Sequence, residues 1–277
     1  YKGCATIGIE PTNAANDSDH ETLQMYFNTD SAKHVLEKIG KPDFITFTNV
    51  FAHIGNLPEL LDSLHLLLNE KTVIVIENHY LGAILQTEQF DTYYHEHPRT
   101  YSHRSFEYIA KSLKLDLLDA QYVSRYGGNI RVYLGQGKPK SLPGHDETKF
   151  MDQFKKLRDD IETWRFNTKN WINKYVEKNG KFRAKAFPGR ASILIRLLGL
   201  DESHISAVYE IRGSIKVGYY VPGTRIPILP EAELYAQKNQ DDVILNLAWH
   251  IPGEVRANLL LNGHTGKVID IKPMNAG

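Results

Sequence analysis

Apolar residues in the first half of the chain follow two alternating patterns. Short apolar runs typical of buried strands lie at 5–9, 43–47, 72–76, 117–124 and 129–134. Apolar residues at helical spacing lie between them, at 31–39, 57–68 and 105–113. Strands that alternate with helices predict a mostly parallel sheet flanked by helices. The last two strands are expected to pair antiparallel around Tyr126, Gly127 and Gly128.

The second half repeats the alternation after a Gly/Pro/Lys stretch at 135–144. An amphipathic helix is predicted at 146–177, and a strand, a turn and a helix follow at 182–187, 188–190 and 191–198. Further strands are predicted at 205–209, 243–247 and 268–269. This outline is typical of a nucleotide-binding α/β half. We therefore expect an N-terminal α/β domain, a helical linker and a smaller Rossmann-like α/β domain, at 1–140, 141–180 and 181–277.

Composition narrows the class of protein. The chain has 277 residues, with 33 Lys and Arg against 33 Asp and Glu, so no basic surface for nucleic acid or an anionic membrane is expected. One cysteine, Cys4, excludes an intrachain disulfide and a cysteine zinc site. No apolar run reaches membrane-spanning length and no signal peptide is visible, so a cytoplasmic location is expected. The first residue is Tyr, so we expect the chain to be a fragment.

The densest group of proton-handling side chains is Tyr94, His95, Glu96 and His97. Histidine titrates near neutral pH, and a neighbouring carboxylate can hold its charge. Such a group suits the removal of a proton beside a carbonyl. A solvated loop and a structural network are the alternatives. His95 and His97 could also chelate a metal, but no third ligand is evident nearby, so no metal is expected.

Polar residues end the strands of the first half. Ligands of open parallel sheets bind beyond the carboxyl ends of the strands, where Glu10, Asn49 and Glu77 are expected. An acid there can accept hydrogen bonds from both ribose hydroxyls of an adenosine ligand. The alternative is that Glu10 caps the next helix or pairs with a lysine. Asn49 and His53 lie four apart and would share one side of a helix, although His53 could equally be a buried histidine bonded to backbone.

Five motifs, in a fixed order along the chain, point to one protein family. They are GIEP at 8–11, DFITFTNVFAHI at 43–54, FDTYYHEH at 90–97, YGGNIRVY at 126–133 and VPGTRIPI at 221–228. With these motifs the chain resembles the S-adenosylmethionine-dependent sugar C-methyltransferases. That family acts on nucleotide-linked 4-keto-deoxy sugars in antibiotic and surface-polysaccharide pathways. The motifs span about 220 residues, which is more specific than one short fingerprint.

The resemblance implies roles for several residues in cofactor binding and catalysis. Glu10 would hold the ribose of S-adenosylmethionine, and Asn49 would line the methionine side of its pocket. Tyr94, Glu96 and His97 match the Y-x-E-H catalytic stretch of the family. His97 would be the base that takes a proton from the carbon beside the ketone, and Glu96 would stabilise the resulting imidazolium.

The resemblance and the residue chemistry also predict substrate contacts. His53 matches a second active-site histidine, which, like Tyr94, could donate a hydrogen bond to the enolate oxygen. Asn129 and Arg131 match the segment that runs beside the sugar. The C-terminal half would receive the nucleotide of a nucleoside diphosphate 4-keto sugar. Two cations there are candidates for holding the diphosphate, or else are solvated: Arg190 and Lys216.

The sequence also departs from the family pattern. Complete members begin with a cysteine-rich zinc domain and carry a Gly-rich cofactor loop before the GIEP strand, and this sequence contains neither. We therefore expect an α/β chain with a truncated class I, Rossmann-like methyltransferase domain, a helical linker and a second Rossmann-like domain. The alternatives are a non-catalytic nucleotide-sugar-binding module and an NAD(P)-dependent sugar-nucleotide oxidoreductase or epimerase. The oxidoreductase would need a Gly-rich turn, and 188–189 is a poor one. No feature predicts an oligomeric state.

Overall fold

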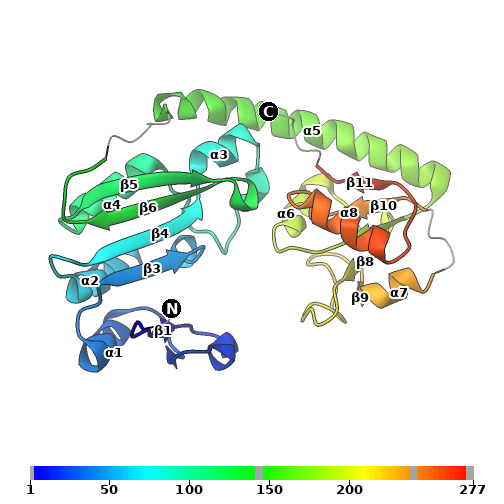
Figure 1. Cartoon of the computed structure of the whole chain (residues 1–277). Helices are drawn as coiled ribbons and strands as arrows, with labels where there is room; N and C mark the ends of the chain where they lie inside the picture. Colours follow the sequence, from blue (N-terminus) through cyan, green and yellow to red (C-terminus); the bar gives the residue numbers. More distant parts are fainter. Residues whose placement is uncertain (1–2, 141–145, 238–241, 273–277) are drawn as a thin grey trace. The chain divides into compact units, whose positions relative to one another are not determined.

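A computed structural model describes residues 3–140, 146–237 and 242–272 (Figure 1). The chain divides into two compact units. The first unit comprises Tyr1–Ala83 and His95–Thr148, and the second comprises Ile84–Tyr94 and Lys149–Gly277. The expected α/β class is confirmed. The mostly parallel sheet predicted for the first half is wrong, because β6 (Asn129–Gly135) pairs antiparallel with both of its neighbours. The segment Ile84–Tyr94 groups with the second unit although it lies early in the chain, which the pattern of apolar residues did not predict.

The first unit is built on a four-stranded sheet in the order β3-β4-β6-β5. Its strands are β3 (Phe44–Thr48), β4 (Val73–His79), β5 (Asp116–Val123) and β6 (Asn129–Gly135). Strands β3 and β4 are parallel, whereas β6 pairs antiparallel with both β4 and β5. The expected antiparallel pair of β5 and β6 is therefore confirmed. A separate parallel pair joins β1 (Gly8–Ile9) to β2 (Thr22–Leu23).

Helices and short 3₁₀ turns connect these strands. The helices are α1 (Thr29–Ile39), α2 (Leu57–Leu67) and α4 (His103–Ser112), and α3 (Leu81–Gln86) runs from the first unit into the second. The 3₁₀ turns are η1 (Asn13–Asp17), η2 (Phe51–His53), η3 (Phe90–Thr92), η4 (Arg125–Gly127) and η5 (Glu147–Lys149). Helix α4 begins two residues before the predicted 105, because Ser102 and Ser105 form a reciprocal capping box there.

Strand β4 lies at the centre of the first unit. Ile74 and Ile76 are fully buried, as expected for an apolar run covered on both faces. The strand continues past Glu77 to His79, because β6 pairs with it as far as Asn129. Glu77, which the sequence predicts at the end of the strand, therefore lies inside it and is only 3% exposed.

The second unit is built on a five-stranded, wholly parallel sheet in the order β11-β10-β7-β8-β9. Its strands are β7 (Phe182–Lys185), β8 (Ile205–Glu210), β9 (Ile228–Pro230), β10 (Ile244–Asn246) and β11 (Val268–Asp270). The crossover helices are α6 (Ala191–Leu198), α7 (Glu231–Tyr235) and α8 (Pro252–Leu261). The chain moves outward from β7 to β9 and returns to β10 on the other side of β7. Neighbouring strands β7 and β10 therefore form a topological switch point, where such sheets bind ligands.

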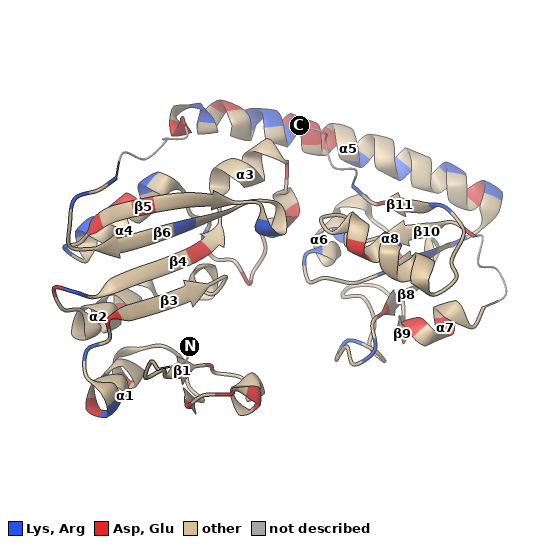
Figure 2. Cartoon of the chain, viewed as in Figure 1, with Lys and Arg blue, Asp and Glu red and all other residues tan. Residues whose placement is uncertain are grey.

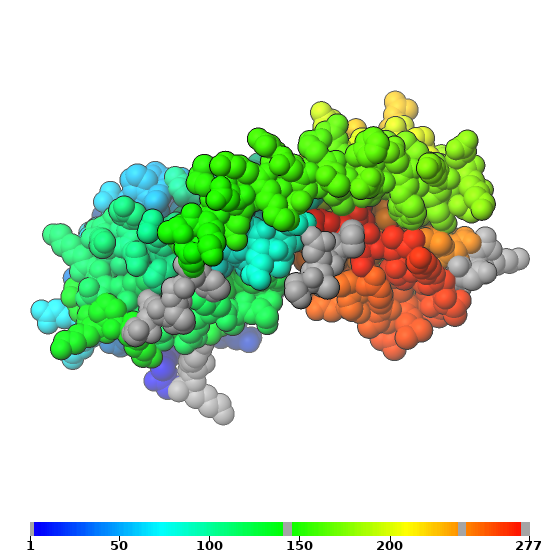
Figure 3. Space-filling model, turned by 90° about the horizontal axis from the view of Figure 1, so that it is seen from above, coloured from blue at the N-terminus to red at the C-terminus, as the bar shows by residue number. Residues whose placement is uncertain are grey.

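The long helix α5 (Phe150–Asn179) belongs to the second unit. It buries only Leu157 and Ile172, and its outer side is open along its length (Figure 3). Charges of both signs cover it (Figure 2). Near its end Tyr175 stacks on Phe182, with ring centroids 4.1 Å apart. Among the described residues no helix is long and apolar enough to cross a membrane.

Stability of the second unit should depend on pH through His250. Burial, helped by the positive charge of Arg190 and opposed by Asp91, lowers the pKa of His250 to about 4. The unfolded chain then binds a proton more readily, so stability is complete above the unfolded pKa of 6.5 and is lost as the pH falls towards 4. Between pH 7 and 4 we expect His250 to contribute a loss of about 2 kcal/mol, after allowance for solvent screening.

Tryptophan fluorescence during urea unfolding measures this loss in the second unit, because all three tryptophans, at 164, 171 and 249, lie there. His250→Gln should flatten the pH dependence relative to the unsubstituted protein. His34→Gln, which removes an exposed histidine of the first unit, should leave it unchanged. Equal pH dependence in all three proteins would show that His250 is not responsible.

Candidate active site

Three histidines from distant parts of the chain meet in the first unit. The ring centroid of His97 lies 4.7 Å from that of His53 and 5.8 Å from that of His79, and both pairs meet edge to face. His53 ends η2, His79 ends β4, and His97 lies in the loop before α4. The sequence pointed to His53 and His97 but missed His79. One signal was available, because His79 is two residues after Glu77 and shares its side of the strand.

Packing and backbone contacts position His53 and His97. Phe51 is fully buried, with its ring 5.5 Å from Phe47 and 5.3 Å from Tyr101, so it fixes the short turn that ends at His53. The guanidinium of Arg99 donates hydrogen bonds of 3.1 Å and 2.7 Å to the carbonyl oxygens of Ile54 and Gly55. Arg99 therefore ties the loop that carries His97 to the residues that follow His53.

A buried carboxylate organises the neighbouring polar residues. Glu77 accepts hydrogen bonds from Nε and Nη2 of Arg131, at 2.9 Å and 2.6 Å, and from Nδ2 of Asn129 at 3.1 Å. The same Nδ2 lies 3.0 Å from Oδ1 of Asn49. Two residues predicted to line the ligand site, Asn129 and Arg131, thus bind one carboxylate, and a third, Asn49, contacts Asn129. Asn49 has a backbone φ of 54°, a left-handed conformation that asparagine tolerates better than most residues.

Electrostatics keep this carboxylate ionised. Burial would raise the pKa of Glu77, but hydrogen bonds from Arg131 and Asn129 and the charges of Arg131 and Arg125 outweigh it and lower the pKa. In turn Glu77 raises the pKa of Arg131. The Arg131 side chain remains 35% exposed, so part of it faces solvent.

Glu10 directly follows β1. Its Oε1 accepts hydrogen bonds from the backbone N–H and the hydroxyl of Thr12, at 2.8 Å and 2.6 Å. These two bonds lower the pKa of Glu10, the hydroxyl bond having the larger effect. Both use Oε1, which leaves Oε2 as an acceptor for a ligand hydroxyl.

The rest of the predicted catalytic stretch is divided between the units. Tyr94 ends the segment Ile84–Tyr94 of the second unit, whereas Glu96 belongs to the first. The Glu96 carboxylate lies 4.0 Å from Nε2 of His95, and both side chains are largely exposed. The predicted support of His97 by Glu96 stays a prediction.

The two cations predicted to hold a diphosphate lie in the second unit and already have partners. Arg190 is only 7% exposed, and its guanidinium binds Asp91 and Gln89. Nζ of Lys216 donates a 2.6 Å hydrogen bond to the carbonyl oxygen of Phe187. Their diphosphate role stays a prediction. No group of three or more His, Cys, Asp or Glu side chains in the described ranges is placed to hold a metal ion.

Comparison with known proteins identifies the family. A family model described as a methyltransferase domain matches residues 1–123. A second, described as a C-methyltransferase C-terminal domain, matches residues 125–269, more than half of the chain. The chain belongs to this C-methyltransferase family.

Two methyltransferases are among the proteins to which the chain is similar. The chain is 24% identical over 271 residues to C-methyltransferase NovU of Streptomyces niveus, covering 92% of this chain and 64% of that relative's length. A phosphoethanolamine N-methyltransferase 2 of Haemonchus contortus, solved with phosphomonomethylethanolamine and S-adenosylhomocysteine, shares 12% identity. That comparison covers 97% of this chain and 70% of the other at a TM-score of 0.27.

The two arginines near Glu77, Arg131 and Arg125, should contribute differently to the free energy of unfolding. Arg131→Met would leave a buried carboxylate without its bidentate partner and should lower the free energy of unfolding by about 2–3 kcal/mol. Arg125→Met is the matched control, because Arg125 is 57% exposed and its Nη1 lies 3.9 Å from Glu77. Its loss should stay below about 1 kcal/mol. Differential scanning calorimetry measures the stability of both variants. Equal losses of stability would contradict the role assigned to Arg131.

Proposed function

We propose that this chain is the catalytic part of an S-adenosylmethionine-dependent enzyme that methylates a carbon beside the ketone of a nucleotide-linked 4-keto-deoxy sugar. The observation that carries the proposal is the meeting of His53, His79 and His97 near the charged group of Glu77 and Arg131. Membership of the C-methyltransferase family supports transfer to carbon. The identity of the substrate rests on the sequence motifs.

The residues of the first unit fit a methyl donor with an adenosine ribose. Glu10 is ionised and keeps Oε2 for the ribose hydroxyls. Oδ1 of Asn129 is buried and has no hydrogen-bond partner among the described residues, so it is an unused acceptor beside Asn49. Asn49 is held beside Asn129 and would line the methionine side. When bound, S-adenosylmethionine supplies an electrophilic methyl group for a carbon nucleophile.

His97 is proposed as the base that creates this nucleophile. A neutral imidazole takes the proton from the carbon beside the ketone, and the electron pair of the C–H bond moves onto the ketone oxygen. His53 or Tyr94 donates a hydrogen bond to the enolate oxygen as its charge develops. His79, whose ring edge meets His97, helps to orient the imidazole. The ionised Glu77 and the fixed Arg131 keep the surrounding charges constant during the proton transfer.

The sugar and the nucleotide of the substrate are assigned to different groups of residues. The sugar would lie near Asn129 and Arg131, because the guanidinium of Arg131 is partly exposed and pre-oriented by Glu77. The nucleotide would bind the second unit, whose parallel sheet has the strand order of a nucleotide-binding half.

Glu10 should control cofactor affinity. In the full-length protein, Glu10→Ala should weaken S-adenosylhomocysteine binding by about 10- to 100-fold, because hydrogen bonds to a charged group are lost. Glu59→Ala, which removes an acid at the start of α2, is the control and should leave affinity unchanged. Isothermal titration calorimetry measures both, and an unchanged affinity of Glu10→Ala would remove it from the ribose site.

His97 should be required for proton removal independently of methyl transfer. The wild-type protein should exchange the proton beside the ketone of a nucleoside diphosphate 4-keto-deoxy sugar in D₂O, without cofactor. His97→Asn should slow both exchange and methyl transfer by about 10²- to 10⁴-fold while leaving both binding affinities nearly intact. Mass spectrometry follows both products.

His34→Asn, an exposed histidine outside the site, is the control for His97. More than about a tenth of normal turnover in His97→Asn would move the base role to Tyr94 or His53. Nucleotide binding without any exchange would favour a non-catalytic nucleotide-sugar-binding module.

A further inference from the structure

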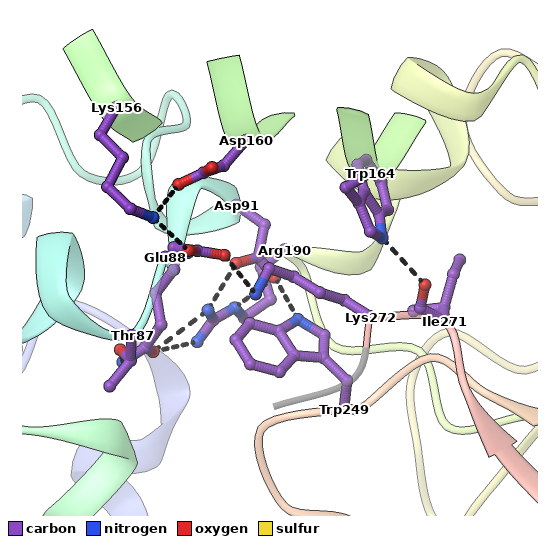
Figure 4. Close-up of polar contacts among 11 residues, drawn as sticks. Thr87, Glu88, Asp91, Lys156, Asp160, Trp164, Arg190, Trp249, Ile271 and Lys272 are labelled. Carbon is purple, nitrogen blue, oxygen red and sulfur yellow. Dashed lines mark hydrogen bonds and ion pairs between the residues drawn. The ribbon is translucent and has the colours of Figure 1, made fainter. Parts of the chain in front are cut away.

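Three side chains that follow strands of the second unit converge on its early segment, Ile84–Tyr94 (Figure 4). Arg190 follows the turn after β7, Trp249 follows β10, and Lys272 follows β11. Because these strands are parallel, all three lie beyond the same edge of the sheet. Strands β7 and β10 flank the topological switch point, so this is the place where such a sheet would bind an anion.

The anion found at this place is the carboxylate of Asp91. Nε and Nη2 of Arg190 donate hydrogen bonds of 2.8 Å and 2.6 Å to its two oxygens, a bidentate pair. The indole N–H of Trp249 donates a third bond of 2.8 Å. Nη1 and Nη2 of Arg190 also lie 3.3 Å and 3.2 Å from Oε1 of Gln89. Asp91 is fully buried, and Trp249 is 1% exposed.

Three more charged side chains, Lys272, Glu88 and Lys156, lie beside this contact. Nζ of Lys272 lies 3.9 Å from Oε2 of Glu88 and 4.4 Å from the ring centroid of Trp249. Lys156 of α5 lies 3.4 Å from Oε1 of Glu88. Burial lowers the pKa of Lys272, against the opposing charges of Glu88 and Asp91. The segment is therefore held at Glu88, Gln89 and Asp91 by groups from four elements of the second unit.

Energetics favour a positioning role for this contact. Desolvation of two charges removes much of the gain of a buried ion pair, so an apolar pair of similar volume is often as stable. Compared with an apolar pair, the ion pair fixes the direction in which the segment Ile84–Tyr94 runs and which of its residues meets Arg190. Tyr94 lies three residues after Asp91, and His97 lies six residues after it. On the far side of His97, Arg99 binds the backbone of the first unit.

We propose that the Asp91–Arg190–Trp249 contact is the anchor that fixes the start of the catalytic stretch 94–97, so that Asp91 and Arg190 are positioning residues for the methyl transfer. The anion site at the switch point is then filled by a carboxylate of this chain, and not by the substrate diphosphate. The effect on turnover rests on the proposed function, whereas the ordering of residues 92–98 does not.

The test replaces the charged pair by apolar residues of similar size in the full-length protein. Asp91→Leu with Arg190→Met should keep the fold, with a midpoint of tryptophan-monitored unfolding within about 5 °C of the wild type. Amide hydrogen exchange of residues 92–98 should become at least about tenfold faster. Turnover should fall at least about tenfold, with KM for the cofactor and the sugar nucleotide within about threefold.

A matched control changes another buried arginine of the same unit. Arg183 is 8% exposed, and its Nη1 donates a 2.8 Å hydrogen bond to Gln237. Arg183→Met with Gln237→Leu should leave exchange at 92–98 and turnover unchanged. Trp249→Phe removes one bond to Asp91 and keeps both charges. It should raise exchange at 92–98 by a smaller factor, and it keeps the test decisive if the apolar double variant does not fold.

Three outcomes would overturn the anchor. Unchanged exchange at 92–98 in the apolar double variant and in Trp249→Phe would show that the contact does not order the stretch. Equal losses in the Arg183 control would show a general effect on stability. A raised KM for the sugar nucleotide with unchanged kcat would assign Arg190 to the diphosphate. If no keto sugar reacts even with the wild type, the proposed function is wrong. Amide hydrogen exchange of residues 92–98 still tests the anchor in that case.

Discussion

A buried carboxylate requires fixed donors, and this requirement shapes the first unit. Glu77 lies inside the central strand at 3% exposure, and it is stable there because Arg131 and Asn129 on the neighbouring strand bind it. The antiparallel register of β4 and β6 places Arg131 directly opposite Glu77. The same contact orients Asn129 towards Asn49, while the Arg131 side chain stays 35% exposed. The residues that stabilise buried Glu77 in the folded chain are therefore also residues of the candidate site.

The second unit uses the same chemistry for a different purpose. Its buried carboxylate, Asp91, comes from a segment far from its partner in sequence, since Arg190 is 99 residues away. The contact joins Ile84–Tyr94 to the edge of the parallel sheet where a ligand is expected in folds of this type. In a sheet whose strand order is typical of nucleotide binding, this edge can therefore bind a carboxylate of the same chain. Fold order alone could not distinguish the two.

Family membership and activity rest on different observations. Matches over residues 1–123 and 125–269 place the chain in the C-methyltransferase family. The chain spans 64% of the length of NovU, the curated relative it matches, so its cofactor and substrate are proposals. The three histidines and the available oxygen of Glu10 give those proposals a chemical basis in the first unit.

The sequence alone determined the α/β class, most strands and helices, the antiparallel pair of β5 and β6, and the grouping of Asn129 with Arg131. These features depend on residue spacing within about ten positions, because apolar periodicity and turn chemistry are local. Tertiary structure decided that His79 meets His97, that Glu77 lies within β4, and that Ile84–Tyr94 belongs to the second unit. Those contacts join residues far apart in the chain, and single-sequence patterns carry no information about which distant partner a side chain meets.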